Sequence, residues 1–333
     1  MTLRTRSLRL KQPAAFSKIR PANRISDKGR PSDFWWPALF SLLPTSVSLM
    51  EFLSKPFAGN QLMKSSIRLL FTSLMFGTFC VSPVIAEDSN SGDSEAELAK
   101  KIQNPVANLV SVPFQNNWDF GIGTEDAMQY TLNVQPVIPF SITEEYNLIT
   151  RTIMPVVYAE SPVPNGDSHT GLSDIIQSFF FSPKDSVGGW ILGGGPVFLY
   201  PSATEVELGS GKWGTGPTIV ALRQEDGWTY GFLGNQINSI FGQESREQVS
   251  KSFLQPFVSY TTKTYTTFGV NTESTYDWKN DQWTVPVNVF VSQLVKVCEL
   301  PISLLGGIRE YSEAPDGGPN WGLRFQVQLL FPK

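Results

Sequence analysis

WGLRFQVQLLFPK, residues 321–333, shows a regular alternation of residue types. From Trp321 to Phe331 every second residue is apolar, and this period of two predicts a β-strand with one apolar face. Four of the residues between them are not apolar: Gly322, Arg324, Gln326 and Gln328. A soluble β-protein would bury the apolar face, whereas a membrane barrel would turn that face to lipid and the arginine to the lumen. Other parts of the sequence have to decide between these two folds.

Residues 63–86, MKSSIRLLFTSLMFGTFCVSPVIA, have the composition of a secretory signal peptide. Lys64 and Arg68 form a positive start, an apolar core follows, and a small-residue cleavage site ends at Ala86. The apolar core is too short for a spanning helix. We therefore expect an exported protein whose mature chain begins near Glu87.

Residues 1–62 precede this segment and carry ten Lys or Arg against three Asp or Glu. Three interpretations are open: a start codon placed too early, a long targeting extension, or a membrane anchor built on the apolar residues 34–44. Because signal peptides normally lie at the extreme N-terminus, we favour a start at Met63 over one at Met50. Residues 1–62 are then expected to be a disordered extension.

Removal of residues 1–86 changes the charge of the chain. It leaves 14 Lys or Arg against 27 Asp or Glu, a net charge of −13, which argues against a nucleic-acid partner. Cys80 follows Phe79 where a lipoprotein signal needs a small residue, so we expect no lipid anchor. Cys298 is then the single remaining cysteine, which excludes an internal disulfide.

Residues 87–115 are expected to form an acidic linker and a short amphipathic N-terminal helix. Within 94–114, apolar residues recur at helical spacing opposite Lys100 and Lys101. Pro105 has to start a turn or kink this helix. The apolar residues at helical spacing are Leu98, Ile102, Val106 and Leu109.

Residues 116–333 are expected to form an all-β domain, an antiparallel transmembrane β-barrel of about twelve strands. Most of the predicted strands have ten to fifteen residues. Strands of soluble proteins run about five or six residues, whereas strands that cross a membrane need roughly nine to eleven. Strand length therefore favours the membrane barrel. The predicted strands are 118–123, 128–140, 146–160, 172–181, 188–200, 212–224, 228–242, 249–262, 265–278, 282–296, 300–312 and 321–333.

The connections between these strands also favour a barrel. If the mature chain starts in the periplasm, the outer connections include the long segments 161–171, 201–211 and 313–320. The inner connections are short, such as 141–145 and 225–227. Outer-membrane barrels sort their loops in this way, whereas a β-sandwich has no reason to do so.

Aromatic residues cluster near the predicted strand ends, as expected for the girdles at a membrane surface. Alternation is weaker in 172–181, 212–224 and 228–242, so the inward faces of these strands are not assigned. Prolines also lie inside predicted strands, and because proline lacks a backbone donor we expect bulges or ladder gaps at several of them. These prolines are residues 136, 155, 196, 217, 256 and 286.

Several motifs, taken in order, resemble a bacterial outer-membrane transporter family. They include NPVANLVSVPFQNNWDFGIG (104–123), GLSDIIQSFFFSP (171–183), GGGPVFLYPSAT (193–204), WTVPVN (283–288) and the final WGLRF. The family is labelled putative meta-pathway of phenol degradation and is often misnamed neuromedin U; the resemblance covers residues 95–333. It implies an outer-membrane channel for small apolar or aromatic compounds. Two features depart from the family: the ending Phe331-Pro332-Lys333 is not aromatic at its last position, and residues 1–62 have no counterpart.

Polar residues on the inferred inward faces are the candidates for lining a pore. A charge inside a barrel needs a partner or water, so these residues either line a channel or form ion pairs that brace a packed interior. The segment 94–114 would plug that lumen or lie at its periplasmic rim. The candidate residues are Arg151, Asn271, Glu273, Asn288, Arg309, Arg324, Gln326 and Gln328.

The expected function is passive uptake of small, apolar or aromatic solutes. One alternative is a structural or adhesion barrel without transport, and another is an outer-membrane lipid hydrolase. A hydrolase needs a base, and the single histidine is His169, with Asp167 and Ser168 beside it. Adjacency in a loop does not make a catalytic triad, which is defined by geometry.

We therefore expect no enzyme activity, no catalytic residue and no cofactor. No metal site is expected either, because the sequence has no cluster of His and Cys. The expected location is the outer membrane of a Gram-negative-type bacterium. The expected partners are outer-membrane lipid, the barrel-assembly machinery and a small-molecule solute.

Overall fold

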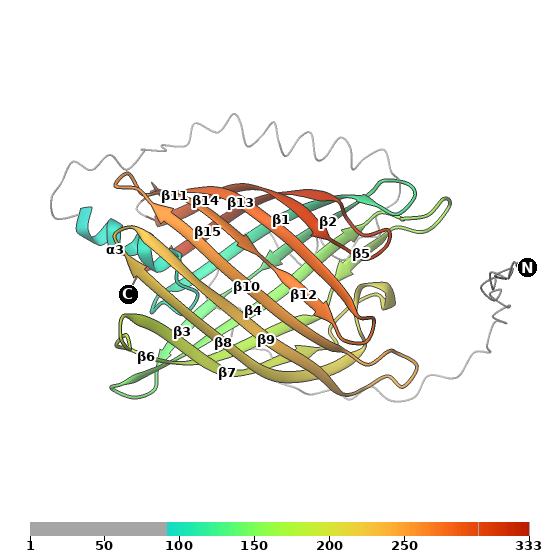
Figure 1. The fold of residues 1–333 in the computed structure, drawn as a ribbon, viewed down its shortest axis with the longest axis horizontal. Coiled ribbons are helices and arrows are strands. Elements are labelled where there is room, and N and C mark those ends of the chain that lie inside the picture. Colours follow the sequence, from blue (N-terminus) through green and yellow to red (C-terminus); the bar gives the residue numbers. More distant parts are fainter. Residues whose placement is uncertain (1–91, 299, 333) are drawn as a thin grey trace, which may run out of the picture. The chain divides into compact units, whose positions relative to one another are not determined.

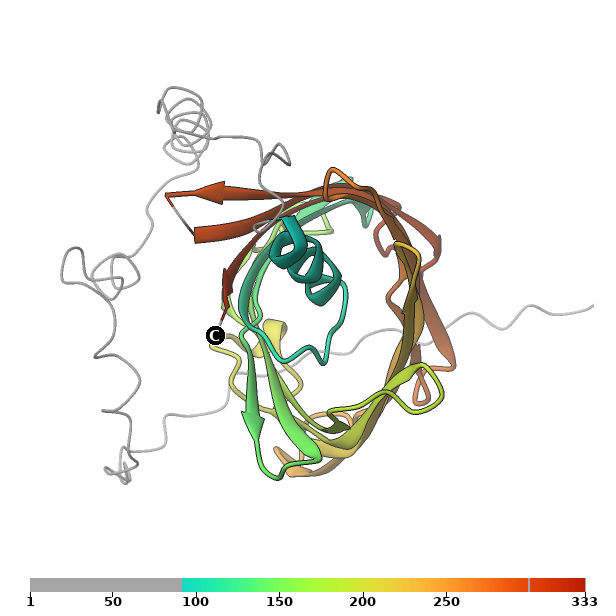
Figure 2. The ribbon, with the colours of Figure 1, turned by 90° about the vertical axis from the view of Figure 1, so that its left-hand side faces the viewer.

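The computed structural model describes residues 92–298 and 300–332, in which one antiparallel β-sheet closes into a barrel (Figures 1 and 2). The expectations for residues 1–91 lie outside this part of the chain. Helix α3 (Gly92–Ile102) precedes the sheet, and the 3-10 turn η1 (Val206–Leu208) lies in a loop. No helix among the described residues has the length and apolarity to cross a membrane. The strands are β1 (Val110–Ile122), β2 (Ala127–Val134), β3 (Val137–Ser141), β4 (Tyr146–Ala159), β5 (His169–Leu172), β6 (Ile175–Pro183), β7 (Trp190–Tyr200), β8 (Lys212–Glu225), β9 (Trp228–Gly242), β10 (Ser250–Thr261), β11 (Thr266–Thr272), β12 (Ser274–Asp277), β13 (Gln282–Val297), β14 (Leu300–Glu313) and β15 (Trp321–Phe331).

Three pairs of short strands are the halves of interrupted barrel strands. β2 and β3 both pair with β4 on one side, β5 and β6 pair with β4 on its other side, and β11 and β12 both pair with β13. When each pair is counted once, the barrel has 12 strands, as predicted from the sequence.

The barrel closes where the last strand meets the first. β15 runs antiparallel to β1, with Val110 opposite Phe331 and Phe120 opposite Trp321. This seam removes the free sheet edges, whose unpaired backbone groups a structure surrounded by lipid cannot keep. The terminal strand is thus the strand that closes the barrel.

Prolines lie at the interruptions, as the sequence predicts. Pro136 separates β2 from β3. Pro155 O accepts from Ser173 N in the break between β5 and β6, and Pro286 O accepts from Glu273 N in the break between β11 and β12. Because proline has no N–H, the ladder cannot be completed at these points.

The outer surface of the barrel is apolar, and polar side chains are buried behind it. Phe268 and Ile308 are 55% and 59% exposed, whereas the adjacent Thr267 and Arg309 are 3% and 8% exposed. A soluble sandwich would show the opposite pattern. An apolar outer surface is the surface of a barrel that stands in a membrane. Exposed apolar residues occur on strands from β6 to β15, namely Phe181, Leu192, Ile219, Phe232, Val258, Phe268, Val289, Leu304 and Leu323.

Aromatic side chains pair across neighbouring strands near the ends of the barrel. Phe120 stacks on Trp321 with 4.7 Å between ring centroids, and Trp213 stacks on Phe241 at 5.6 Å. At the opposite end of the strands, Trp228 lies against Tyr260 at 5.0 Å. Amphipathic rings at both ends form the girdles expected at the two membrane surfaces.

Residues 92–122 differ from the prediction. α3 ends at Ile102, whereas the predicted helical pattern ran to residue 114. β1 begins at Val110, so the predicted start of the first strand at 118 and of the barrel at 116 was wrong. Pro105 prevents the helix from continuing. From Val110 onward the side chains alternate between buried and half-buried, which is the period of a strand.

The longer connections lie at the end of the barrel opposite α3 (Figure 1). They are 160–168, 201–211, 243–249 and 314–320, and the turns at the α3 end include 142–145, 226–227 and 262–265. Two connections at the far end, 123–126 and 278–281, are also short. The predicted sorting of long loops to one end therefore describes most of the connections.

Candidate functional site

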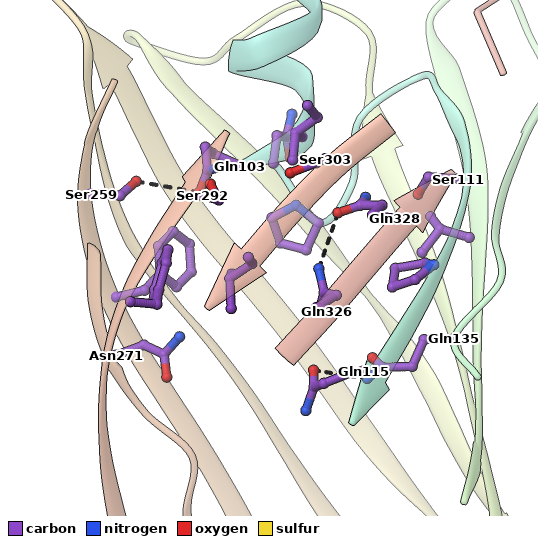
Figure 3. Close-up of a pocket in the computed structure, with 18 of the residues that line it drawn as sticks. Gln103, Ser111, Gln115, Gln135, Ser259, Asn271, Ser292, Ser303, Gln326 and Gln328 are labelled. Carbon is purple, nitrogen blue, oxygen red and sulfur yellow. Dashed lines mark hydrogen bonds between the residues drawn. The ribbon is translucent and has the colours of Figure 1, made fainter. Parts of the chain in front are cut away.

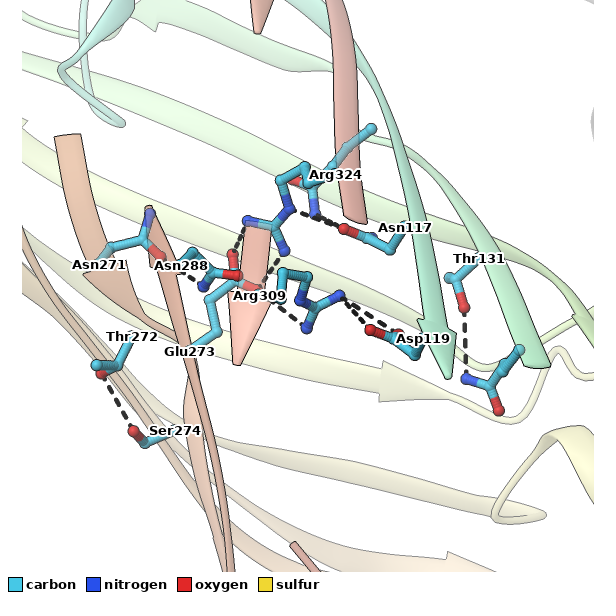
Figure 4. Close-up of polar contacts among 12 residues, drawn as sticks. Asn117, Asp119, Thr131, Asn271, Thr272, Glu273, Ser274, Asn288, Arg309 and Arg324 are labelled. Carbon is cyan, nitrogen blue, oxygen red and sulfur yellow. Dashed lines mark hydrogen bonds and ion pairs between the residues drawn. The ribbon is translucent and has the colours of Figure 1, made fainter. Parts of the chain in front are cut away.

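Charged side chains from β1, β14, β15 and the break between β11 and β12 meet inside the lumen (Figure 4). Arg324 and Glu273 form a two-point ion pair, with 2.8 Å between Nη1 and Oε1 and 2.7 Å between Nη2 and Oε2. Arg324 Nε also donates to Asn117 Oδ1 at 2.7 Å. Paired hydrogen bonds of this kind fix the plane of the guanidinium group as well as its position.

A second arginine lies beside this pair. Arg309 Nη1 lies 3.3 Å from Asp119 Oδ1, and Arg309 Nη2 lies 3.9 Å from Glu273 Oε2. Asn288, opposite Arg309 on β13, donates from Nδ2 to Asn271 Oδ1 at 2.8 Å. Glu273 therefore stands between two guanidinium groups.

A chain of amides connects the third arginine to the same network. Arg151 Nη2 donates to Gln135 Oε1 at 2.8 Å, and Gln135 Nε2 donates to Gln115 Oε1 at 3.1 Å. Gln115 Nε2 lies 3.4 Å from Asn117 Oδ1, which also accepts from Arg324. We term this connected set the charged wall: Gln115, Asn117, Asp119, Gln135, Arg151, Glu273, Arg309 and Arg324.

The charged wall has an excess of positive charge. Three arginines face two carboxylates, so one positive charge is left over at neutral pH. Charges inside a membrane barrel have to be paired or hydrated, and the ion pairs meet this need for four of the five groups. The remaining charge makes this side of the lumen attractive to anions, since a confined space screens charge poorly.

The other side of the lumen is apolar. Five side chains from β4, β6, β8 and β9 contact one another, and each is at most 3% exposed. These strands lie across the ring from β13, β14 and β15 in the strand order. We term this set the apolar wall: Ile149, Phe180, Val220, Leu222 and Leu233.

The residues between α3 and β1 enter the lumen. Val106 is 4% exposed and packs against the apolar wall. Ala107 and Leu109 belong to a second buried cluster with Leu294 and Leu330, which are inward residues near the ends of β13 and β15. Figures 1 and 2 place α3 at the mouth of the barrel where β13 and β15 end. Residues 92–109, here termed the N-terminal segment, therefore narrow the lumen.

Polar contacts hold the N-terminal segment to three strands. Glu95, which is 5% exposed, forms an ion pair with Lys296 on β13. Gln224 Nε2 on β8 donates to the backbone oxygen of Lys100 at 2.9 Å. Ser259 Oγ on β10 lies 3.5 Å from Gln103 Oε1. The segment is thus fixed at several points around the mouth.

A cavity of about 200 Å³ remains between the N-terminal segment and the charged wall (Figure 3). Its polar lining includes Gln326 and Gln328, which are hydrogen-bonded to each other at 3.3 Å, and its apolar lining includes Phe257 and Phe290. Ligand pockets for drug-sized molecules have roughly 300–1,000 Å³. With the segment in place, the cavity therefore accepts only a small molecule, which would meet polar and apolar surfaces together.

The structure brings all eight predicted pore-lining residues to the inner side of the barrel. Two of them, Asn288 and Arg309, are buried at 1% and 8% exposure beside the cavity rather than in its lining. The six that line the cavity are Arg151, Asn271, Glu273, Arg324, Gln326 and Gln328.

Several residues of the charged wall were missed by sequence reasoning. Asn117 and Asp119 on β1 alternate with the outward aromatic residues Trp118 and Phe120, so the period-two pattern could have found them. Gln135 was harder to assign because it stands at the proline break between β2 and β3. The apolar wall had little signal in the sequence; in β6, for example, the three consecutive phenylalanines 179–181 show no alternation.

His169 lies at the loop end of the barrel, at the start of β5. Its Nδ1 atom lies 2.8 Å from Glu205 Oε2 and 3.7 Å from Glu207 Oε2. These partners come from the loop 201–211 rather than from the adjacent Asp167 and Ser168. The arrangement gives no support to a hydrolase built on the sequence around His169.

The fold resembles solved outer-membrane channels at low sequence identity. The COG4313 outer membrane channel from Pseudomonas putida F1 matches with a TM-score of 0.53 and 12% identity, over 67% of this chain and 94% of that chain. The NanC porin matches with a TM-score of 0.43 and 9% identity, over 67% and 100% of the two chains. The KdgM porin matches with a TM-score of 0.38 and 12% identity, over 67% and 99%. No protein-family model and no curated protein matches the sequence. At a TM-score of 0.53 and 12% identity, the likeness to the COG4313 channel shows the β-barrel fold and leaves the solute open.

Proposed function

We propose that this protein is a passive channel of the outer membrane for small solutes. The observation that carries the proposal is the lumen itself, in which a cavity of about 200 Å³ lies beside a charged wall and below an N-terminal segment. A barrel built only for structure or adhesion would be more stable with a fully packed interior, because unfilled volume costs packing energy. The interior of this barrel instead keeps polar side chains turned toward open space.

The proposed solutes are small molecules with an apolar or aromatic part. Phe257 and Phe290 give the cavity an apolar surface that water-filled porins do not need. The excess positive charge of the charged wall favours solutes that also carry a negative group. Aromatic acids combine the two properties. The resemblance to the phenol meta-pathway transporters points to the same class of compound.

The N-terminal segment is proposed to limit passage. Val106 and Leu109 fill part of the lumen, so a solute larger than the cavity can pass only if the segment shifts. The segment is attached at its outer end by the ion pair between Glu95 and Lys296. Passage would then be slow and selective by size.

The apolar outer surface is proposed to contact outer-membrane lipid, and the seam between β1 and β15 to close with the help of the barrel-assembly machinery.

Flux through the purified, refolded protein in liposomes tests the proposal. Liposomes are exposed in turn to a sugar, an amino acid and an aromatic acid of similar size, and entry is followed by swelling or tracer uptake. The expected result is entry of the aromatic acid ahead of the sugar. A barrel that is folded, as judged by its heat-dependent migration on a gel, but passes none of the three would support the structural or adhesion alternative.

A further inference from the structure

One cluster of ligand-type side chains lies outside the lumen, at the loop end of the barrel. His169, Glu205 and Glu207 each offer one ligand atom, and these atoms lie within 4.8 Å of one another. They come from two segments that are distant in the sequence, the start of β5 and the loop 201–211. It is the one group of three such residues in the described part of the chain whose atoms meet this closely.

The distances between the ligand atoms suit a divalent transition metal. The His169 Nδ1 atom lies 2.8 Å from Glu205 Oε2 and 3.7 Å from Glu207 Oε2. Zinc binds imidazole nitrogen and carboxylate oxygen at about 2.0–2.2 Å in tetrahedral geometry, which places ligand atoms roughly 3.3 Å apart. The two observed distances lie on either side of this value, and all three ligand atoms lie within 4.8 Å of one another, so the side chains would draw together around an ion.

The loop that carries both carboxylates is held in place before any ion binds. Arg246 donates to the backbone oxygens of Val206, the first residue of the turn η1, and of Gly209, which follows the turn. Asp174, 7% exposed, accepts from Ser210 N at 2.6 Å. Ligands on a braced loop lose less freedom when they bind, which raises affinity.

The two segments are also joined next to the cluster. Leu172 N donates to Thr204 Oγ1 at 3.0 Å, and Thr204 N donates to Leu172 O at 3.0 Å. A Cβ on Gly171 would lie 2.0 Å from Thr204 Oγ1, so only glycine permits this approach. The close approach fixes Glu205 beside His169, and Thr170 N lies 3.4 Å from Glu205 Oε1.

We propose that His169, Glu205 and Glu207 bind a divalent transition cation of the zinc type. One nitrogen and two carboxylate oxygens match the ligands that zinc accepts, and three protein ligands leave a fourth position open. The set has too few oxygens for calcium, which takes six to eight. The ion would join the loop 201–211 to β5 at the outer rim, and the site is independent of solute passage through the lumen.

This site could not be predicted from the sequence. His169 and Glu205 are separated by 36 positions and share no metal-ligand spacing. The expectation that the chain has no metal site rested on the missing cluster of His and Cys. The fold supplies a mixed cluster of one histidine and two carboxylates instead.

Titration calorimetry with zinc on the full, detergent-solubilised protein tests the proposal. The expected result is one zinc ion per barrel, with affinity lowered about tenfold or more in His169→Ala and in Glu207→Gln. Glu207→Gln is the decisive variant, because the hydrogen bond between His169 and Glu205 does not need Glu207. The matched control is Glu313→Gln, an exposed carboxylate at the same end of the barrel, which should bind zinc as the unmodified chain does.

Cobalt absorption gives a second measurement on the same proteins. A bound cobalt ion with nitrogen and oxygen ligands in a low-coordinate site should give visible bands that are lost in His169→Ala. Heat-dependent gel migration verifies that each variant is folded. Zinc binding that is absent from the unmodified chain, or that is equal in Glu207→Gln and Glu313→Gln, would overturn the proposal.

Discussion

Glu273 is the residue on which the charged wall depends. It accepts two hydrogen bonds from Arg324 and lies 3.9 Å from Arg309, so it compensates two cations from one position. Removing one partner of a buried ion pair is costly because the other charge stays behind without compensation. The proline break that ends β11 at Thr272 leaves Glu273 between two strands, facing both arginines.

Glu273→Gln is expected to lower the free energy of unfolding by about 2 kcal/mol, because two guanidinium groups lose their shared carboxylate. It also raises the excess positive charge of the lumen, which should increase the preference for anions. Unfolding in denaturant and the reversal potential in a salt gradient measure these two effects. The control is the exposed Glu313→Gln.

A double variant separates pairing from packing at this position. If the ion pair is the cause, Glu273→Gln combined with Arg324→Gln should cost less stability than the sum of the two single changes. Equal stability of Glu273→Gln and Glu313→Gln would show that Glu273 does not hold the wall together.

The two faces of β15 are expected to differ in how well they accept a charged side chain. Val327 lies opposite Phe114 and Leu304, in a row of outward apolar residues, whereas Gln326 lies opposite Gln115 in the lumen. We expect Val327→Arg to destabilise the barrel by about 2–4 kcal/mol, the cost of a charge that faces lipid at mid-depth. Gln326→Arg should assemble normally and change the conductance. Heat-dependent gel migration of the membrane fraction compares the assembly of the two variants. Normal assembly of Val327→Arg together with impaired assembly of Gln326→Arg would mean that the faces are exchanged.

The N-terminal segment is the element that narrows the lumen. Because β1 begins at Val110, a deletion of residues 92–108 removes all of the segment except Leu109 and leaves the barrel strands whole. Single-channel conductance of this deletion is expected to rise, since Val106 and the cavity-facing residues leave the lumen. Lys296→Ala, which breaks only the ion pair with Glu95, should give a smaller rise. Unchanged conductance in the deletion would exclude the segment as an obstruction.

The elements that the sequence predicts best are those with different neighbours on their two faces. β15 stands between lipid and a polar lumen, so its composition alternates and its pairing and orientation can be predicted. β6 stands between lipid and the apolar wall: Phe180 is 0% exposed and Phe181 is 48% exposed, yet both are phenylalanine. A strand that is apolar on both faces carries no period, so its inward residues could not be assigned in advance.

At the scale of the whole molecule, the lumen is built from parts that meet only when the barrel closes. The charged wall draws on β1, β4, β14 and β15, and Asn117 and Arg324 face each other across the closing seam. The polar character of these residues was predictable from alternation, but their partners were not. Which arginine meets which carboxylate depends on register, on proline breaks and on the seam.

The fit of Val106 against the apolar wall also belongs to this scale. Its contacts lie on β4, β6, β8 and β9, so they form only after these strands are in place. In the sequence the same residue appeared to continue a helix. The whole barrel, rather than local spacing, decides that this residue closes part of the lumen.

Single-channel recording of the full chain in a planar bilayer tests directly whether the lumen is a passage. We expect discrete conductance steps that are small with the N-terminal segment present, larger in the deletion of residues 92–108, and altered by Gln326→Arg. Folded barrels that give no steps, in the unmodified chain and in the deletion alike, would contradict this expectation.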